Sequence, residues 1–218
     1  MAFEAAFPCI RATNADRYIF LGDICGYYFD TLVIWEKLVT LPRLVAILGN
    51  HDAFFLKCVQ QGCVPEQYIQ KYGPSLELLL RYPATLVKEK FISWLHSNPS
   101  QYTSPEGLLH CVHGSPLDPL DGYMYPNSPL PIGAFAPFVL CGHTHYSMVR
   151  EQSGTVFFNP GSLGQPRNGE MPTYGVIDTK NKTCSIYHVQ YDAKRYAQEI
   201  FDTYPEYPYL YSVLVRNK

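Results

Sequence analysis

Short apolar runs that end abruptly in glycine or polar residues recur through the first two thirds of the chain. Runs of this length and composition are typical of buried strands. Four of them predict strands, at residues 18–21, 44–48, 108–112 and 138–141. Each run leads directly into a residue that can bind a metal ion, which predicts strands that deliver polar side chains to one shared site.

Helical periodicity separates these predicted strands. Asp30 or Thr31 is the expected N-cap of one helix, and Pro42 ends the turn that leads to the next strand. The last of these helices within the first half is amphipathic and stops before Asn98-Pro99. The helices are expected at residues 2–13, 32–38, 53–62, 74–82, 86–95 and, near the end of the chain, 193–201.

The later part of the chain predicts short strands instead. These strands are expected at residues 148–150, 156–158, 174–178 and 184–189. Residues 115–136 are rich in proline and glycine and are expected to form a long loop that roofs the site. A βα-rich half followed by a β-rich half predicts an α/β fold, a four-layer α-β-β-α sandwich of two mixed sheets, in one domain over residues 1–218.

Composition and charge narrow the class of protein. Of 218 residues, 47% are hydrophobic and 17% are charged, which is ordinary for a folded globular chain. The net charge of -2 gives no basic field over the whole molecule, so we expect no binding to long nucleic acid, with a local basic patch as the open alternative. Nothing in the sequence approaches an apolar membrane span. The oligomeric state stays open, and a homo-oligomer is one alternative.

Cysteine usage bears on the compartment. The chain has 7 cysteines, an odd number, with no C-x-x-C pair. Cys111 and Cys141 lie inside apolar runs, where a reduced cysteine acts as a small hydrophobe. A reducing compartment follows, and we expect a cytoplasmic protein.

Candidate metal ligands follow the predicted strands. Taken alone, Asp23 after its strand is more typical of a helix cap or turn than of a metal ligand, and His113 is similarly ambiguous. His143 and His145 are more informative, because this spacing in an extended chain places both imidazoles on one face. Nitrogen and oxygen ligands together favour Mn, Fe, Ni or Zn over Ca.

The pair Asn50 and His51 is the most informative. An amide oxygen is an uncommon but serviceable metal ligand, and the neighbouring imidazole must point elsewhere. His51 is therefore free to act as an acid.

Taken together and in this order, these motifs resemble the calcineurin-like metallophosphoesterase superfamily. The motifs are Gly22-Asp23, Gly49-Asn50-His51-Asp52, His113-Gly114 and Gly142-His143-Thr144-His145. Asn159-Pro160-Gly161-Ser162 and Pro166-Arg167 further resemble its compact bacterial and archaeal phosphodiesterase branch. The resemblance implies two divalent metals. Asp23 would bridge them, Asn50, His113 and His143 would complete the second site, and His145 would belong to the first.

The resemblance also implies an activity. The chain would be a metal-dependent phosphoesterase, of the phosphodiesterase kind, that hydrolyses a small phosphate ester by attack of metal-activated hydroxide. His51 would protonate the leaving oxygen and Asp52 would orient its imidazole. Asn50 and Arg167 would contact the substrate phosphate, although Arg167 is equally typical of a loop-pairing arginine.

One departure from the family pattern affects both fold and activity. The Asp-x-His motif at the end of a first strand is absent, so the first strand is missing and the first metal lacks two ligands. We expect the second metal site to be the better retained and the activity to be impaired. A start upstream of Met1, the apolar tail at 209–215 or a partner chain could supply the strand. The alternative function is a catalytically inactive scaffold or binding protein of the same fold.

Overall fold

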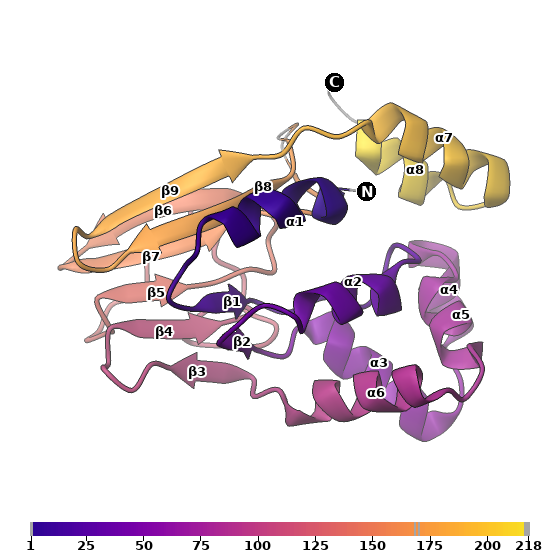
Figure 1. Cartoon of the computed structure of the whole chain (residues 1–218), viewed down its shortest axis with the longest axis horizontal. Coiled ribbons are helices and arrows are strands. Elements are labelled where there is room, and N and C mark those ends of the chain that lie inside the picture. The colour runs from indigo at the N-terminus through magenta and orange to yellow at the C-terminus, as the bar shows by residue number, and fades with distance from the viewer. Residues whose placement is uncertain (1, 168, 170, 216–218) are drawn as a thin grey trace.

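The computed structural model describes residues 2–167, 169 and 171–215. Figure 1 shows strands gathered on one side of the molecule and most helices on the other. The helices are α1 (Ala2–Ala12), α2 (Thr31–Leu38), α3 (Asn50–Gln61), α4 (Glu66–Tyr72), α5 (Ser75–Arg81), α6 (Leu86–Ser97), α7 (Ala193–Thr203) and α8 (Pro208–Val215). The strands are β1 (Tyr18–Phe20), β2 (Leu44–Ala46), β3 (Gln101–Thr103), β4 (Leu109–Val112), β5 (Phe138–Leu140), β6 (Ser147–Gln152), β7 (Thr155–Pro160), β8 (Thr173–Asp178) and β9 (Thr183–His188).

The predicted α/β class is confirmed, and the described strands form three hydrogen-bonded sheets. The largest is mixed, with five strands in the order β3-β4-β5-β7-β6. Its centre is parallel, because β5 pairs in parallel with both β4 and β7. The other two sheets are the parallel pair β1-β2 and the antiparallel hairpin β8-β9.

The side chains of β5 show how the layers stack. Phe138 and Leu140 pack with apolar residues of β1, β8 and β9 on one face of the five-stranded sheet. Val139 alternates to the opposite face, where Met124 and Leu130 cover it. The predicted loop at 115–136 therefore forms, and it supplies the layer over this face in place of a helix.

A helical cluster packs beyond the ends of β1 and β2 (Figure 1). Its core is aromatic: Trp35, Phe55 and Phe91 are buried and join α2, α3 and α6. The sequence periodicity predicted these three helices. It missed α4 and β3, two short elements whose patterns are too brief to register.

The C-terminal tail forms a helix, so the alternative in which residues 209–215 fill the place of a first strand is wrong. Helices α7 and α8 pack against each other, and Leu210 is fully buried in contact with Gly73. Pro208 at the first position favours a helix, and a short apolar run alone cannot distinguish helix from strand. Among the described residues, β1 pairs with β2 alone and β8 with β9 alone.

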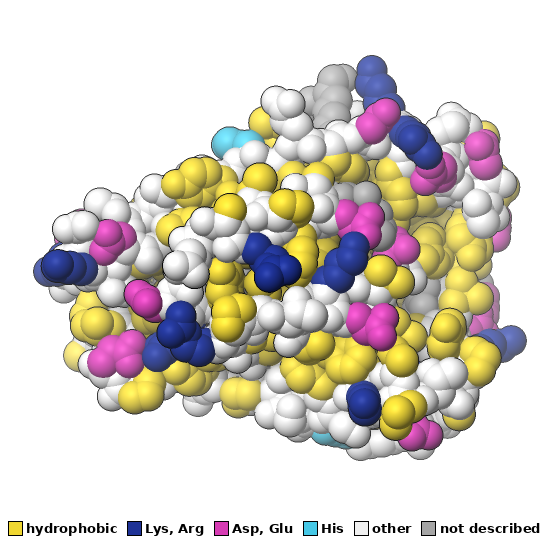
Figure 2. All heavy atoms as spheres, viewed as in Figure 1, with side chains coloured by type: hydrophobic (Ala, Val, Ile, Leu, Met, Phe, Trp, Pro, Cys, Tyr) yellow, Lys and Arg dark blue, Asp and Glu magenta, His cyan; other side chains and the backbone are white. Residues whose placement is uncertain are grey.

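The surface offers charges of both signs. Figure 2 shows Lys and Arg side chains interspersed with Asp and Glu among hydrophobic ones on the viewed face. No helix in the described part of the chain is long and apolar enough to cross a membrane.

Candidate metal centre and its surroundings

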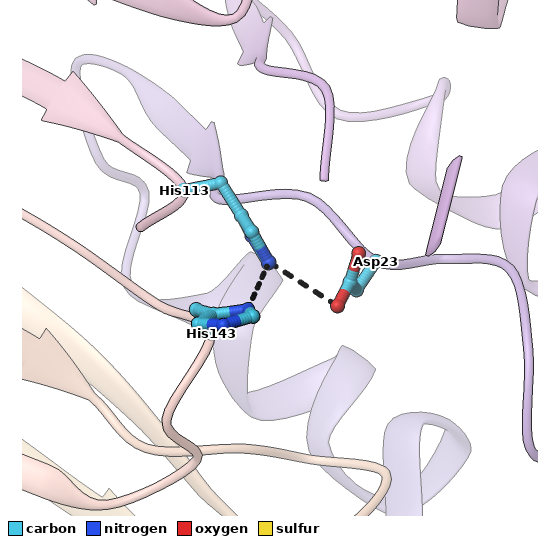
Figure 3. Close-up of side chains that lie close together, drawn as sticks. All are labelled: Asp23, His113 and His143. Carbon is cyan, nitrogen blue, oxygen red and sulfur yellow. Dashed lines mark hydrogen bonds and ion pairs between the residues drawn. The ribbon is translucent and has the colours of Figure 1, made fainter. Parts of the chain in front are cut away.

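Four side chains from four separate segments meet at one point. His113 Nε2 lies 3.2 Å from Asp23 Oδ2 and 3.1 Å from Asn50 Oδ1. His143 Nδ1 lies 3.2 Å from both Asn50 Oδ1 and His113 Nε2. Figure 3 shows Asp23, His113 and His143 pointing toward one another. The structure therefore brings together the four residues expected at the second metal site.

Glycines allow these segments to approach so closely. A Cβ on Gly22 would lie 2.5 Å from the backbone nitrogen of Gly49, and Gly22 has a φ of +91°. A Cβ on Gly49 would lie 2.1 Å from Asp23 Oδ1. The loops after β1 and β2 can thus bring Asp23 and Asn50 together only because both positions lack a side chain.

The backbone of the site is strained. Four non-glycine residues around it have left-handed φ values: 63° at Asp23, 55° at Tyr27, 59° at His143 and 62° at His145. This conformation costs an ordinary residue about 1–2 kcal/mol. Such strain concentrates at functional sites, where surrounding contacts hold it in place.

His113 has its ring fixed from both sides. Its Nδ1 lies 2.6 Å from the carbonyl oxygen of Leu21, and a carbonyl can only accept, so Nδ1 carries the proton. Nε2 is left with the lone pair that faces Asp23 and Asn50. A second ring nitrogen bonded to a backbone carbonyl is the usual arrangement of a metal-binding histidine.

Opposite charges stabilise the ionised form of Asp23. Burial alone would raise the pKa of its carboxyl group, but the charges of His113 and His51 and their hydrogen bonds hold the pKa well below the usual range. The backbone N–H of His51 donates to Asp23 Oδ1 over 2.9 Å. For His113 the signs are reversed: burial alone would lower its pKa, but the carboxylate of Asp23 raises it.

His145 does not join this cluster, and the backbone between His143 and His145 is not extended. The prediction of an extended chain from His143 to His145 is wrong, because both residues have left-handed φ values. His143 joins Asp23 and His113 as a group able to hold a metal ion, and His145 is not part of that group. His145 donates from Nδ1 to the carbonyl of Gln165 over 2.9 Å, which leaves its Nε2 with a lone pair.

His51 contacts a residue that the sequence did not single out. Its Nδ1 lies 2.7 Å from the hydroxyl oxygen of Tyr68 on α4. The ring of Tyr27 packs against it at 4.8 Å between centroids. Burial lowers the pKa of His51, and the charge of Asp23 opposes that shift.

Asp52 does not orient His51, so this prediction needs correction. Its fully buried carboxylate accepts three backbone N–H bonds: 2.8 Å from Asp23, 2.9 Å from Cys25 and 3.1 Å from Gly49. Burial, together with the nearby charge of Asp23, raises its pKa, and the three N–H bonds oppose that rise. Asp52 therefore ties the loop that carries Asp23 to the start of α3.

Arg167 lies beside His145 and is hydrogen-bonded to a residue of α8. Its backbone N–H donates to the carbonyl of His145 over 3.3 Å. Its Nη2 donates to the hydroxyl of Tyr209 over 3.1 Å. The helix α8 thus reaches the site through Tyr209, whose ring also lies 6.1 Å from that of Tyr27.

Three tyrosines near the site were not predicted from the sequence. Tyr68 and Tyr72 contact His51 and come from α4, a helix that was not predicted. Tyr209 packs against Tyr27 and Tyr72 and comes from the tail that was one alternative for the missing strand. The periodicity of residues 66–72 is too short to identify a helix, so no signal pointed to them.

The geometry defines an α/β protein with a partly buried cluster of side chains that could hold a metal ion, at the ends of strands. A sequence model of the calcineurin-like phosphoesterase superfamily domain matches residues 2–182. The chain belongs to this superfamily, which confirms the resemblance drawn from its motifs.

Known proteins resemble this chain in sequence or in structure. The uncharacterized protein MJ0912 of Methanocaldococcus jannaschii is 25% identical, with 91% of this chain and 86% of the relative covered. A metallophosphoesterase from Sphaerobacter thermophilus has a similar structure, with a TM-score of 0.73 at 21% identity over 100% of this chain and 94% of that one. The hypothetical protein PH1004 from Pyrococcus horikoshii OT3 gives a TM-score of 0.72 at 18% identity, covering 100% and 93%.

Proposed function

We propose that this chain is a metal-dependent phosphodiesterase that hydrolyses a small phosphate ester. The observation that carries the proposal is the convergence of Asp23, Asn50, His113 and His143 on one point. Its contacts of 3.1 to 3.2 Å suit a single cation. Four tetrahedral ligands at about 2.1 Å from an ion lie about 3.4 Å from one another.

The chemistry of these donors fits a divalent cation as well. An ionised carboxylate, an amide oxygen and two imidazoles are ligands for Mn, Fe, Ni or Zn. His143 Nε2 is buried without a hydrogen-bond partner among the described residues, so this ring still has a nitrogen that can bind a further partner. When bound, a cation here would lower the pKa of a coordinated water and offset charge on phosphoryl oxygens.

Asp23 and the three residues around it form the second site of the family pattern. His145 would be a ligand of the first site, and its free Nε2 suits that role. Only Asp23 and His145 are available there from the predicted set, so we propose that the second site binds the tighter ion.

The remaining residues bind substrate and move a proton. Asn50, at the start of α3, would donate from its amide nitrogen to a phosphoryl oxygen. Arg167 would add a guanidinium to the same group, held in place by Tyr209. His51 would donate a proton from Nε2 to the leaving oxygen, with its Nδ1 held by Tyr68.

Hydrolysis of bis-p-nitrophenyl phosphate with added Mn²⁺ tests this function. The wild-type protein should release p-nitrophenol, and His51→Ala should release it far more slowly while still binding Mn²⁺. No turnover by the wild-type protein, despite bound metal, would favour the inactive scaffold. A cytoplasmic location, the lack of long nucleic-acid partners and the oligomeric state stay predictions.

A further inference from the structure

A pocket of about 250 Å³ opens beside the metal cluster. Asn50 and His51, at the start of α3, line one side of it, so the pocket begins where the proposed chemistry would occur. Its other walls come from later residues of α3, from α4 and from the loop at 115–136. This volume is near the lower limit of small-molecule sites, so it suits one ring-sized group and not a polymer.

Aromatic rings form much of the wall. Phe54 of α3 and Tyr68 of α4 stack on each other with their centroids 4.7 Å apart. Tyr72 packs beside Tyr68 with centroids 4.9 Å apart and forms a T-shaped pair with His51 at 5.8 Å. Rings fixed in this way offer a rigid, flat apolar surface that favours another ring.

Two charged side chains complete the lining. Lys57 lies one helical turn after Phe54 on α3, and Asp121 lies on the opposite loop. Both are exposed, so they keep their water contacts. An ammonium and a carboxylate together suit a ligand with both hydrogen-bond acceptors and donors on its outer edge.

The position of His51 indicates which ester substituent would enter the pocket. In the proposed function His51 gives its proton to the leaving oxygen, and His51 is itself part of the pocket wall. The group attached to that oxygen must therefore lie next to His51, where the pocket opens. The other ester substituent has no such constraint.

We infer that this pocket binds the leaving alcohol of the substrate and selects for an aromatic or heteroaromatic ring, with Phe54 and Tyr72 as the specificity-determining residues. A phenol and a nucleoside both present this chemistry. The inference rests on the proposed phosphoesterase function for its catalytic consequence, but ring binding by the pocket is independent of turnover.

Three diesters that share one substituent test the preference: one with a phenyl, one with a nucleoside and one with a ring-free alkyl leaving group. Tyr72→Leu should lower kcat/KM for the ring-bearing esters by about 3- to 10-fold more than for the alkyl ester. Tyr82→Leu is the matched control, because Tyr82 is exposed at the end of α5 and does not line the pocket. Equal losses for all three esters in Tyr72→Leu would overturn the inference.

Binding measured without metal separates this inference from the proposed function. Phenol and thymidine, titrated separately into the metal-free protein, should shift the NMR signals of the Phe54 and Tyr72 rings, and Tyr72→Leu should weaken that binding. The alcohol that binds more tightly identifies the source of the ring. Ring binding by the metal-free protein, combined with no hydrolysis of any of the three diesters by the Mn²⁺-loaded protein, would contradict the function and keep the pocket assignment. Shifts confined to other residues would contradict the pocket assignment.

Discussion

His113 Nδ1 lies 2.6 Å from the carbonyl oxygen of Leu21, and this one bond determines how the ring can act. It holds the proton on Nδ1 and leaves the Nε2 lone pair for a cation. Leu21 follows directly after β1, so the strand that leads to Asp23 also orients His113. The same strand end thus sets two ligands of the proposed metal site.

Removing His113 should therefore abolish tight metal binding. We expect His113→Ala to weaken Mn²⁺ binding by at least about 10-fold, because even outer partners of metal ligands are worth that much. Isothermal titration calorimetry measures the change. His110→Ala is the matched control: His110 lies on β4, the strand that His113 directly follows, but it bonds to Thr103 Oγ1 over 3.0 Å and is not part of the described group able to hold a metal ion. Equal affinity of the two variants would count against the site.

The hydroxyl of Tyr68 should act on the reaction through His51. Tyr68→Phe removes the hydroxyl that lies 2.7 Å from His51 Nδ1 and leaves the aromatic ring in place. We expect kcat to fall, and by less than the loss of about 100-fold or more expected for His51→Ala. KM and metal affinity should stay near their wild-type values. A raised KM with unchanged kcat would show that Tyr68 binds substrate and does not position His51.

Asp52 should matter chiefly for stability. Asp52→Asn replaces one acceptor oxygen by a donor, so at least one of three buried backbone N–H groups loses its partner. Each such loss costs about 1–3 kcal/mol. The free energy of unfolding, measured in urea, should fall by at least that amount. Unchanged stability with a large loss of kcat would instead restore the interpretation that Asp52 orients His51.

Metal affinity should rise with pH. Asp23 raises the pKa of His113 above its ordinary value, so below that raised pKa a proton competes with the cation for the ring. His145 adds nothing near neutrality, because burial lowers its pKa to about 4. A pH series of Mn²⁺ titrations measures the effect. Affinity that is flat across the neutral range would contradict it.

The stability of the metal-free protein should fall as pH rises. The ion pair between protonated His113 and ionised Asp23 stabilises the folded state in full when the pH lies below the pKa that His113 has in the unfolded chain, about 6.5. This stabilisation is lost as the pH rises through the higher pKa that His113 has in the folded protein. Thermal unfolding of the metal-free protein over this range checks the sign, with His113→Ala as the control that lacks the pair.

The sequence predicted the convergence of the site for a physical reason. Strands that end in the same direction deliver the following residues to one edge, so the polar residues that follow the four apolar runs could be expected at one shared site. The resemblance to a known family then gave them roles. The loop at 115–136 was also correctly expected, because prolines and glycines exclude regular structure.

Other features depend on contacts that no local pattern encodes. His143 and His145 leave the strand through left-handed turns, so an argument from extended geometry failed. Asp52 adjoins His51 in sequence, but its buried carboxylate turns to three backbone amides. The apolar tail became α8 because Leu210 packs on Gly73, a contact between distant parts of the chain.

The most direct test of the account is an anomalous difference map from crystals grown with Mn²⁺. We predict one strong peak bonded to Asp23 Oδ2, Asn50 Oδ1, His113 Nε2 and a ring nitrogen of His143, with a weaker peak or none beside His145. A map with no peak among these four atoms, or with its strongest peak elsewhere in the molecule, would contradict it.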